Sequence, residues 1–126
     1  MSGKNWLLDT NIIIYMVKNE LDLSLFTKEN DTLFISSVSY MECLGYNFSS
    51  AMEEQIITEL CNGFEHILIE NKIIKQTIEI RKNHKIKLPD AIIAATAIIN
   101  KLPLVSHNTK DFIDINGIKL LDPFQL

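Results

Sequence analysis

Leu7-Leu8-Asp9-Thr10-Asn11 sets a carboxylate at the point where an apolar segment gives way to a helical pattern. Residues 6–8 predict a short buried strand, and residues 12–17 (IIIYMV) predict a helix that Thr10 or Asn11 could cap. An acid at this junction either caps the helix or holds a cation. This stretch alone leaves both interpretations open.

The same order of strand and helix recurs along the chain. Further strands are predicted at residues 33–35, 64–69, 102–105 and 118–121. Further helices are predicted around Met41 to Gly45, from about Ser50 to Cys61, from Asn71 through the apolar periodicity to Ile86, and from Leu88-Pro89-Asp90 to Lys101. This alternation predicts an α/β fold with a largely parallel sheet of about five strands and helices on both faces.

Nothing in the composition divides the 126 residues, since there is no repeat and no Gly/Pro/Ser linker, so we expect a single domain over residues 1–126. Cys43 and Cys61 lack the spacing of a zinc site or disulfide framework and fit a reducing cytosol. The longest apolar stretch, residues 91–99, is too short to span a bilayer. We therefore expect a cytoplasmic protein without a membrane segment.

Charge is distributed unevenly along a chain whose net charge is −4. Residues 72–87 contain six basic side chains and one acid, Glu79, and their net charge of +5 leaves −9 for the remainder. This basic segment is either a solvated helix face or a phosphate-binding patch, and its charge alone does not decide between them.

Acidic residues follow several of the predicted strands, at the edge where parallel α/β sheets bind ligands. Asp9 follows the first strand, Glu42 the second, Asp111 the fourth, and Asp90 opens a helix. Each has a structural explanation, because Ser39 and Glu42 match a capping box and the other acids suit helix starts. If these acids converge, they repel one another unless a hard divalent cation such as Mg²⁺ or Mn²⁺ binds. Metal-assisted phosphodiester hydrolysis suits such a site.

Four motifs occur in order along almost the whole chain: LLDTN at residues 7–11, SYMECLGY at 39–46, LPDAIIAATA at 88–97 and LVSHNTKDF at 104–112. Together they closely resemble the PIN domain family, and within it the VapC-type toxins of bacterial and archaeal toxin–antitoxin pairs. The resemblance implies a metal-dependent endoribonuclease that uses one or two Mg²⁺ or Mn²⁺ ions and leaves 5′-phosphate and 3′-hydroxyl ends.

The resemblance also assigns catalytic roles to three acids. Asp9 matches the central metal ligand, Asp90 completes the inner coordination sphere, and Glu42 binds metal directly or through water. The fourth acidic position of the family falls on Asn108, so Asn108 itself or the nearby Asp111 takes that place, and a one-metal mechanism stays open.

Further positions follow from the same resemblance. Asn11 and Ser106 are expected either to orient Asp9 and the last loop or to serve only as a local cap and turn former. An acidic pocket needs cations nearby to hold RNA, and Lys82, Lys85 and Lys87 are the candidates.

The expected partners are a VapB-like antitoxin and a second copy of the chain in a homodimer. An alternative keeps the fold without turnover, as a catalytically weak or inactive nucleic-acid or protein interaction module. Asn108 favours this alternative, whereas Asp9, Glu42 and Asp90 oppose it.

Overall fold

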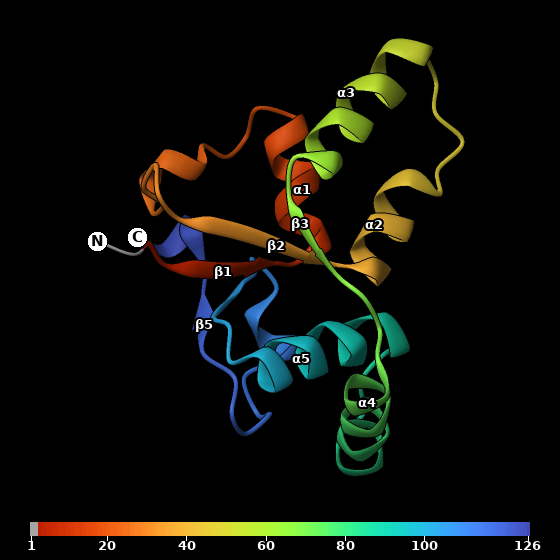
Figure 1. Cartoon of the computed structure of the whole chain (residues 1–126), viewed down its shortest axis with the longest axis vertical. Helices are drawn as coiled ribbons and strands as arrows, with labels where there is room; N and C mark the ends of the chain where they lie inside the picture. Colours follow the sequence, from red (N-terminus) through yellow and green to blue (C-terminus); the bar gives the residue numbers. More distant parts are fainter. Residues whose placement is uncertain (1–2) are drawn as a thin grey trace.

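A five-stranded parallel sheet in the order β3-β2-β1-β4-β5 forms the centre of the computed structural model, which describes residues 3–126 (Figure 1). The strands are β1 (Asn5–Leu8), β2 (Thr32–Ser36), β3 (Glu65–Ile67), β4 (Leu104–Val105) and β5 (Leu120–Leu121). β1 pairs in parallel with both β2 and β4. The predicted α/β fold is confirmed.

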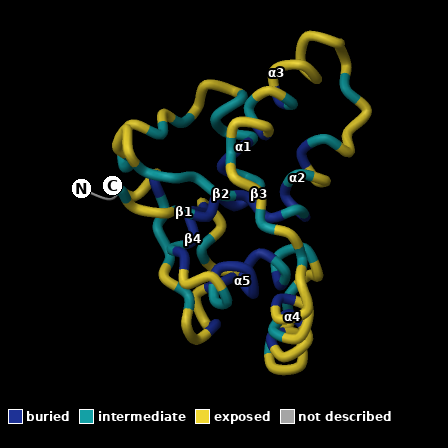
Figure 2. The backbone as a smooth tube through the Cα atoms, in the orientation of Figure 1, coloured by how far each residue is buried: buried dark blue, intermediate teal, exposed yellow. Residues whose placement is uncertain are grey.

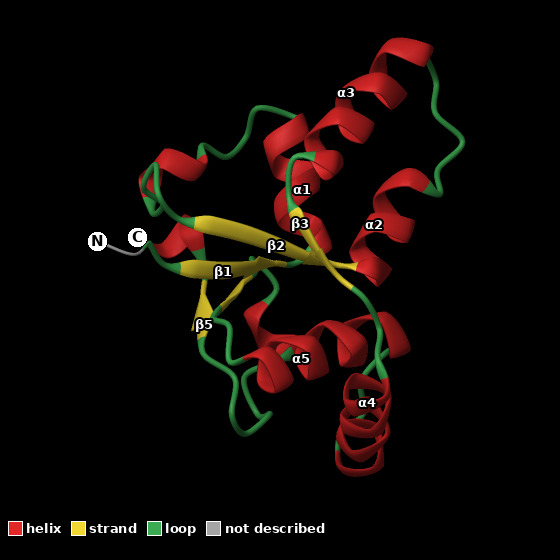
Figure 3. Cartoon of the chain, in the orientation of Figure 1, coloured by secondary structure: helices red, strands yellow, loops and turns green. Residues whose placement is uncertain are grey.

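Helices cover both faces of this sheet (Figure 3). The helices are α1 (Thr10–Val17), α2 (Ser37–Leu44), α3 (Ala51–Asn62), α4 (Asn71–Asn83) and α5 (Leu88–Asn100). Three 3₁₀ turns complete the chain: η1 (Leu23–Leu25), η2 (Thr109–Asp111) and η3 (Pro123–Gln125). α1, α2 and α3 lie on one face, and α4 and α5 lie on the other.

The two faces of β1 belong to two separate hydrophobic clusters, as the alternation of side chains along a strand requires. Leu7 packs in the cluster formed with α4 and α5, whereas Leu8 packs in the cluster formed with α1, α2 and α3. α5 is the most buried helix (Figure 2), and four buried alanines let its backbone approach its neighbours closely. Both faces of the central strand are therefore fixed, and so is the position of the residue that follows it.

Strand register brings distant residues to one edge of the sheet. Leu8 pairs with Val105, so Asp9 and Ser106 follow neighbouring strands at the same level. The backbone N–H of Asp9 continues the ladder by donating to the Val105 carbonyl over 2.9 Å. β1 and β4 therefore bring Asp9 and Ser106 together at the edge where the sequence predicts that the acids converge.

Several predicted boundaries are wrong. The helix expected to run from Asn71 to Ile86 ends at Asn83, and residues 85–87 form an irregular loop in which Ile86 packs against the core. β3, β4 and β5 are shorter than predicted. The capping box at Ser39 is also wrong, because the cap lies three residues earlier, at Ser36, whose hydroxyl oxygen accepts from the Val38 N–H.

None of the helices within residues 3–126 combines the length and apolar character needed to cross a membrane.

Candidate active site

Asp9 is a buried carboxylate, only 5% exposed, at the carboxyl end of β1. Its Oδ1 accepts a 2.8 Å hydrogen bond from the Thr10 backbone N–H. Its Oδ2 accepts a 2.7 Å hydrogen bond from the hydroxyl of Ser106, which is fully buried. Asp9 is therefore the cap of α1 and is also oriented by a side chain from the adjacent strand, which an ordinary capping role does not require.

Burial raises the pKa of Asp9 from 3.8 to about 6. The hydrogen bonds from Ser106 and Thr10 act in the opposite direction, whereas the charges of Asp90 and Glu42 raise this pKa further. The two other predicted acids are thus close enough for their charges to act on Asp9. A bound cation would relieve the cost of ionising it.

Glu42 is exposed on α2 and reaches across to α1. The Thr10 hydroxyl donates to Glu42 Oε1 over 2.7 Å, and it lies 2.9 Å from the hydroxyl oxygen of the buried Ser39. Thr10 therefore links Asp9, through its backbone, to Glu42, through its side chain. The sequence does not predict this role of Thr10, because Ser39 and Glu42 also match a capping box.

Asp90 lies in the first turn of α5, where Pro89 helps to start the helix. Its pKa is raised, first by burial and then by the charges of Asp111 and Glu42, whereas Lys87 lowers it. Asp90 therefore belongs to the same electrostatic group as Asp9, Glu42 and Asp111. The structure brings these four acids to one edge of the sheet.

The loop after β4 turns Asn108 toward Asp111. The Asn108 backbone N–H donates to the Ser106 hydroxyl oxygen over 3.0 Å, and its side-chain amide donates to Asp111 Oδ2. Asp111 lines a cleft together with Asp90. The negative charge beside Asp90 thus comes from Asp111, and Asn108 orients it.

Asn11 was predicted to orient Asp9, and among the described residues no hydrogen bond supports that role. Within residues 3–126 its Oδ1 is buried without a hydrogen-bond partner, and no hydrogen bond joins it to Asp9. A buried acceptor without a partner is costly. Of the two residues expected to orient Asp9, only Ser106 does so through a hydrogen bond.

The donor set fits a hard divalent cation by its chemistry. Asp9, Glu42, Asp90 and Asp111 offer carboxylate oxygens, which Mg²⁺ and Mn²⁺ prefer. Among the residues described, no three His, Cys, Asp or Glu side chains form a ready-made group of metal ligands. Mg²⁺ usually keeps several waters and uses one or two carboxylates, so a closed protein cage is not required.

A cleft of about 430 Å³ lies next to these acids. Its lining residues are Arg81, Lys85, Ile86, Lys87, Asp90 and Asp111. Two of the three lysines expected at the site, Lys85 and Lys87, are therefore beside Asp90. Lys82 is not among the lining residues, and its Nζ lies 3.6 Å from Glu79 Oε1 on the exposed side of α4.

Arg81 lines the cleft but was not among the predicted cationic site residues. Consecutive residues on a helix point about 100° apart, which is consistent with Arg81 lining the cleft and Lys82 lying outside it. The burial of Ile73, Thr77 and Ile80 gives the phase of α4. Placing Arg81 also requires knowing that the helix ends at Asn83 and that the chain then turns back.

The fold and the site together define a parallel α/β domain with an acidic site at the carboxyl ends of its central strands. The model of the PIN domain family matches residues 6–118. The chain therefore belongs to the PIN domain family.

Individual relatives are similar over nearly their full lengths. Ribonuclease VapC1 of Haemophilus influenzae strain R2866 is 31% identical over 129 residues, which cover 93% of this chain and 96% of that protein. A toxin–antitoxin complex from Klebsiella pneumoniae contains a chain 32% identical, with a TM-score of 0.75 and coverage of 94% of this chain and 97% of that one.

A second solved structure has a still higher TM-score. It is VapBC2 from Rickettsia felis bound to a DNA fragment from their promoter, and its matching chain is 26% identical with a TM-score of 0.80. The match covers 93% of this chain and 97% of that one.

Proposed function

We propose that this protein is a metal-dependent endoribonuclease and the toxin of a VapBC-type toxin–antitoxin pair. The observation that carries the proposal is the buried Asp9, which Ser106 orients and whose pKa is raised first by burial and then by the charges of Asp90 and Glu42. The similarity of the whole chain to Ribonuclease VapC1 supports RNA as the substrate. The expected reaction is hydrolysis of a phosphodiester bond that leaves 5′-phosphate and 3′-hydroxyl ends.

Asp9 and Asp90 would hold Mg²⁺ or Mn²⁺, with Glu42 as a direct ligand or one acting through water. When bound, the metal supplies an activated water and stabilises negative charge on the phosphate. The chain's own residues fix the ligands before substrate arrives: Ser106 holds Asp9, and Thr10 holds Glu42. Such preorganisation avoids the cost of moving dipoles during the reaction.

Asp111 supplies the fourth acid in this proposal. The amide of Asn108 donates to Asp111, and the charge of Asp111 acts on Asp90. Asn108 is thereby a positioning residue, and the departure from the family pattern at position 108 is compensated three residues later. One or two ions remain compatible with four acids.

The test is cleavage of end-labelled single-stranded RNA in Mg²⁺ or Mn²⁺, with EDTA as control. Asp9→Asn should remove cleavage. Asp114→Asn should leave it unchanged, because Asp114 is exposed and lies outside the site. Binding of RNA by the wild-type protein without cleavage in either metal would contradict the proposal and support the interaction-module alternative.

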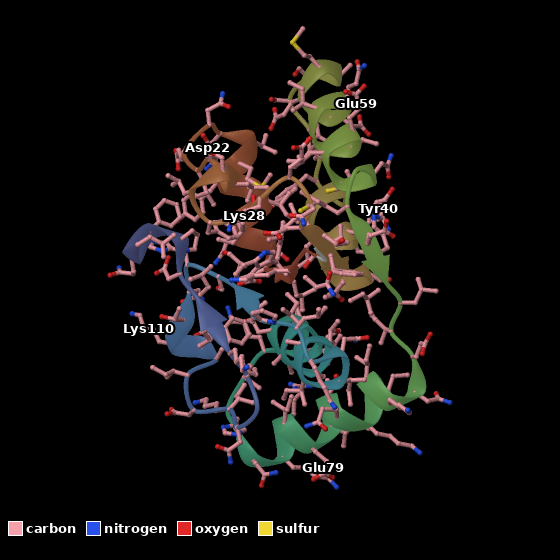
Figure 4. The ribbon with its side chains drawn as sticks, turned by 60° about the vertical axis from the view of Figure 1, so that its left-hand side comes forward. Asp22, Lys28, Tyr40, Glu59, Glu79 and Lys110 are labelled. Atoms are coloured by element: carbon pink, nitrogen blue, oxygen red, sulfur yellow. The ribbon has the colours of Figure 1, made fainter. Side chains whose placement is uncertain are left out.

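The antitoxin surface in this proposal is a groove of about 1320 Å³ with a mixed polar and apolar lining, formed by α1, η1, α3, η3 and the loop between α1 and η1. Leu25 and Ile56 line it and are 64% and 49% exposed. Glu20, Asp22 and Glu59 also line it; Figure 4 shows Asp22 and Glu59 on separate segments, at the end of the molecule opposite Glu79. The negative charge of these three acids, beside the apolar lining residues, fits an antitoxin segment with an apolar face and basic flanks.

Coexpression with the product of the neighbouring reading frame tests the antitoxin proposal. The expected result is a complex that Ile56→Asp weakens, whereas Ile113→Asp, at an exposed position outside the groove, does not. Equal binding by both variants would place the antitoxin elsewhere.

Homodimerisation remains a prediction, and the exposed apolar side chains of Leu68, Ile74 and Ile78 are the surface we propose for it. Light scattering of the wild-type protein and of Ile74→Lys tests it, with a dimer expected for the former and a monomer for the latter. A monomeric wild-type protein would contradict it.

A further inference from the structure

The cleft beside the acids combines cations and carboxylates from four separate segments. Arg81 comes from the last turn of α4, and Lys85 and Lys87 come from the loop that follows. Asp90 comes from the first turn of α5 and Asp111 from η2. Figure 1 shows α4 beside α5 at the lower end of the molecule.

The three cations of the cleft are available to a ligand. Within the described part of the chain, no ion pair joins Arg81, Lys85 or Lys87 to a carboxylate within 4.0 Å. All three residues are exposed. The neighbouring Lys82 differs, because it lies outside the cleft and is paired with Glu79.

We propose that Arg81, together with Lys85 and Lys87, binds the RNA phosphate next to the scissile one. This inference rests on the proposed function, in which the scissile phosphate lies at Asp9 and Asp90. The planar guanidinium of Arg81 can donate two parallel hydrogen bonds to phosphate oxygens, which an ammonium cannot do. The volume of about 430 Å³ is within the range of small-ligand sites and admits about one nucleotide.

The same cleft contributes affinity without sequence preference. Its lining contains charged side chains and the apolar Ile86, with no asparagine, glutamine, serine or threonine. The carboxylates of Asp90 and Asp111 are assigned to the metal, so the remaining donors are the cations. Contacts to phosphates fix the position of a strand but carry no base information.

The test compares Arg81→Gln with Lys82→Gln, which remove one charge each from adjacent exposed positions of α4. Binding of fluorescein-labelled single-stranded RNA is measured by anisotropy in EDTA, which prevents cleavage, over a range of salt concentrations. Arg81→Gln should weaken binding about tenfold, and Lys82→Gln less than about twofold. Loss of one phosphate contact should also reduce the slope of log K against log salt by about 0.7 for Arg81→Gln alone.

Two further comparisons sharpen the result. Arg81→Lys retains the charge without the guanidinium fork, and its affinity should lie between those of the wild-type protein and Arg81→Gln. Arg81→Gln should weaken the binding of two RNAs of unrelated sequence by the same factor. Weaker binding of only one of them would overturn the claim that the cleft binds RNA without sequence preference.

The outcomes separate this inference from the function on which it rests. If the wild-type protein binds RNA and both glutamine variants weaken binding equally, the Arg81 subsite is wrong while the nuclease proposal stands. If the wild-type protein neither binds nor cleaves RNA, both are overturned. Equal thermal unfolding of the two variants establishes that a difference in binding does not come from the fold.

Discussion

Asp9 and Arg81 lie on two sides of the same acidic edge, and the chain fixes them in opposite ways. Asp9 is buried and held by hydrogen bonds from Thr10 and Ser106. Arg81 is exposed at the end of α4, without an ion pair among the residues described. The position of Asp9 is set by strand register, whereas the position of Arg81 relative to the cleft depends on where α4 ends. We refer to these two parts of the site as its buried side and its exposed side.

This difference separates two roles within one site. A rigid carboxylate suits metal binding, because its geometry must be correct before substrate arrives. An exposed cation with freedom to move suits a phosphate that arrives from solvent. Changes on the buried side should therefore alter turnover and metal affinity, and changes on the exposed side should alter RNA affinity.

The largest effect is expected for Asp90→Asn. Loss of this carboxylate should lower kcat for RNA cleavage by at least about a hundredfold, as removal of a single electrostatic group at a reacting centre does. RNA affinity in EDTA should remain similar or increase, because one negative charge is removed from the cleft. Cleavage at wild-type rates would remove Asp90 from the mechanism.

The second effect concerns stability in the absence of metal. The pKa of Asp9 is raised from 3.8 to about 6, so the folded protein holds its proton more tightly than the unfolded chain does. Protonation of Asp9 therefore adds to the free energy of unfolding, fully below pH 3.8, and this added stability is lost as pH rises through about 6. The added stability is about 3 kcal/mol.

Asp9→Asn tests this contribution, because an amide does not ionise. The free energy of unfolding of the wild-type protein relative to this variant should fall between about pH 4 and pH 7 in EDTA. Chemical denaturation at a series of pH values measures it. A difference that does not vary with pH would mean that the burial of Asp9 has no electrostatic cost.

A smaller effect is expected for Ser106→Ala, which removes the hydrogen bond to Asp9 Oδ2. Mn²⁺ affinity should fall about tenfold, since partners that orient metal ligands contribute at least this much. Ser36→Ala is the matched control, because Ser36 is equally buried but caps α2. Calorimetric titration should show weaker Mn²⁺ binding for the first variant alone, and equal weakening would reduce Ser106 to a stabilising residue.

The smallest effect is expected for Thr10→Val, which frees Glu42 from its hydroxyl partner. Cleavage should slow by a few-fold, about the value of one exposed hydrogen bond to a charged group. Thr10→Ser should restore the wild-type rate and its metal dependence, because the hydroxyl returns. Failure of serine to rescue would show that the threonine methyl group, rather than the hydroxyl, is needed.

The sequence predicted the buried side of the site better than the exposed side. Asp9 was found because it follows an apolar strand, and Asp90 because proline and acid mark a helix start. These are local patterns that the structure retains. The link between Thr10 and Glu42 was missed, because a capping box at Ser39 explained Glu42 equally well within the sequence.

The exposed side depends on geometry that no local pattern contains. The apolar period continues to Ile86, although α4 ends at Asn83 and Ile86 reaches the core from a loop. This early end brings Lys85 and Lys87 beside Asp90 and leaves Lys82 outside. A basic segment in a sequence therefore predicts that a substrate-binding surface is positively charged, but it does not identify which residues of the segment line that surface.

The most direct test of the central claim is the change in thermal unfolding on adding Mg²⁺ or Mn²⁺ at pH 7, measured for the wild-type protein, Asp9→Asn and Asp114→Asn. Binding of metal to the folded state raises its stability by RT ln(1 + [metal]/Kd), so the stabilisation grows with metal concentration. Metal should raise the Tm of the wild-type protein and of Asp114→Asn and leave that of Asp9→Asn unchanged. An equal rise in all three proteins would contradict a metal site centred on Asp9.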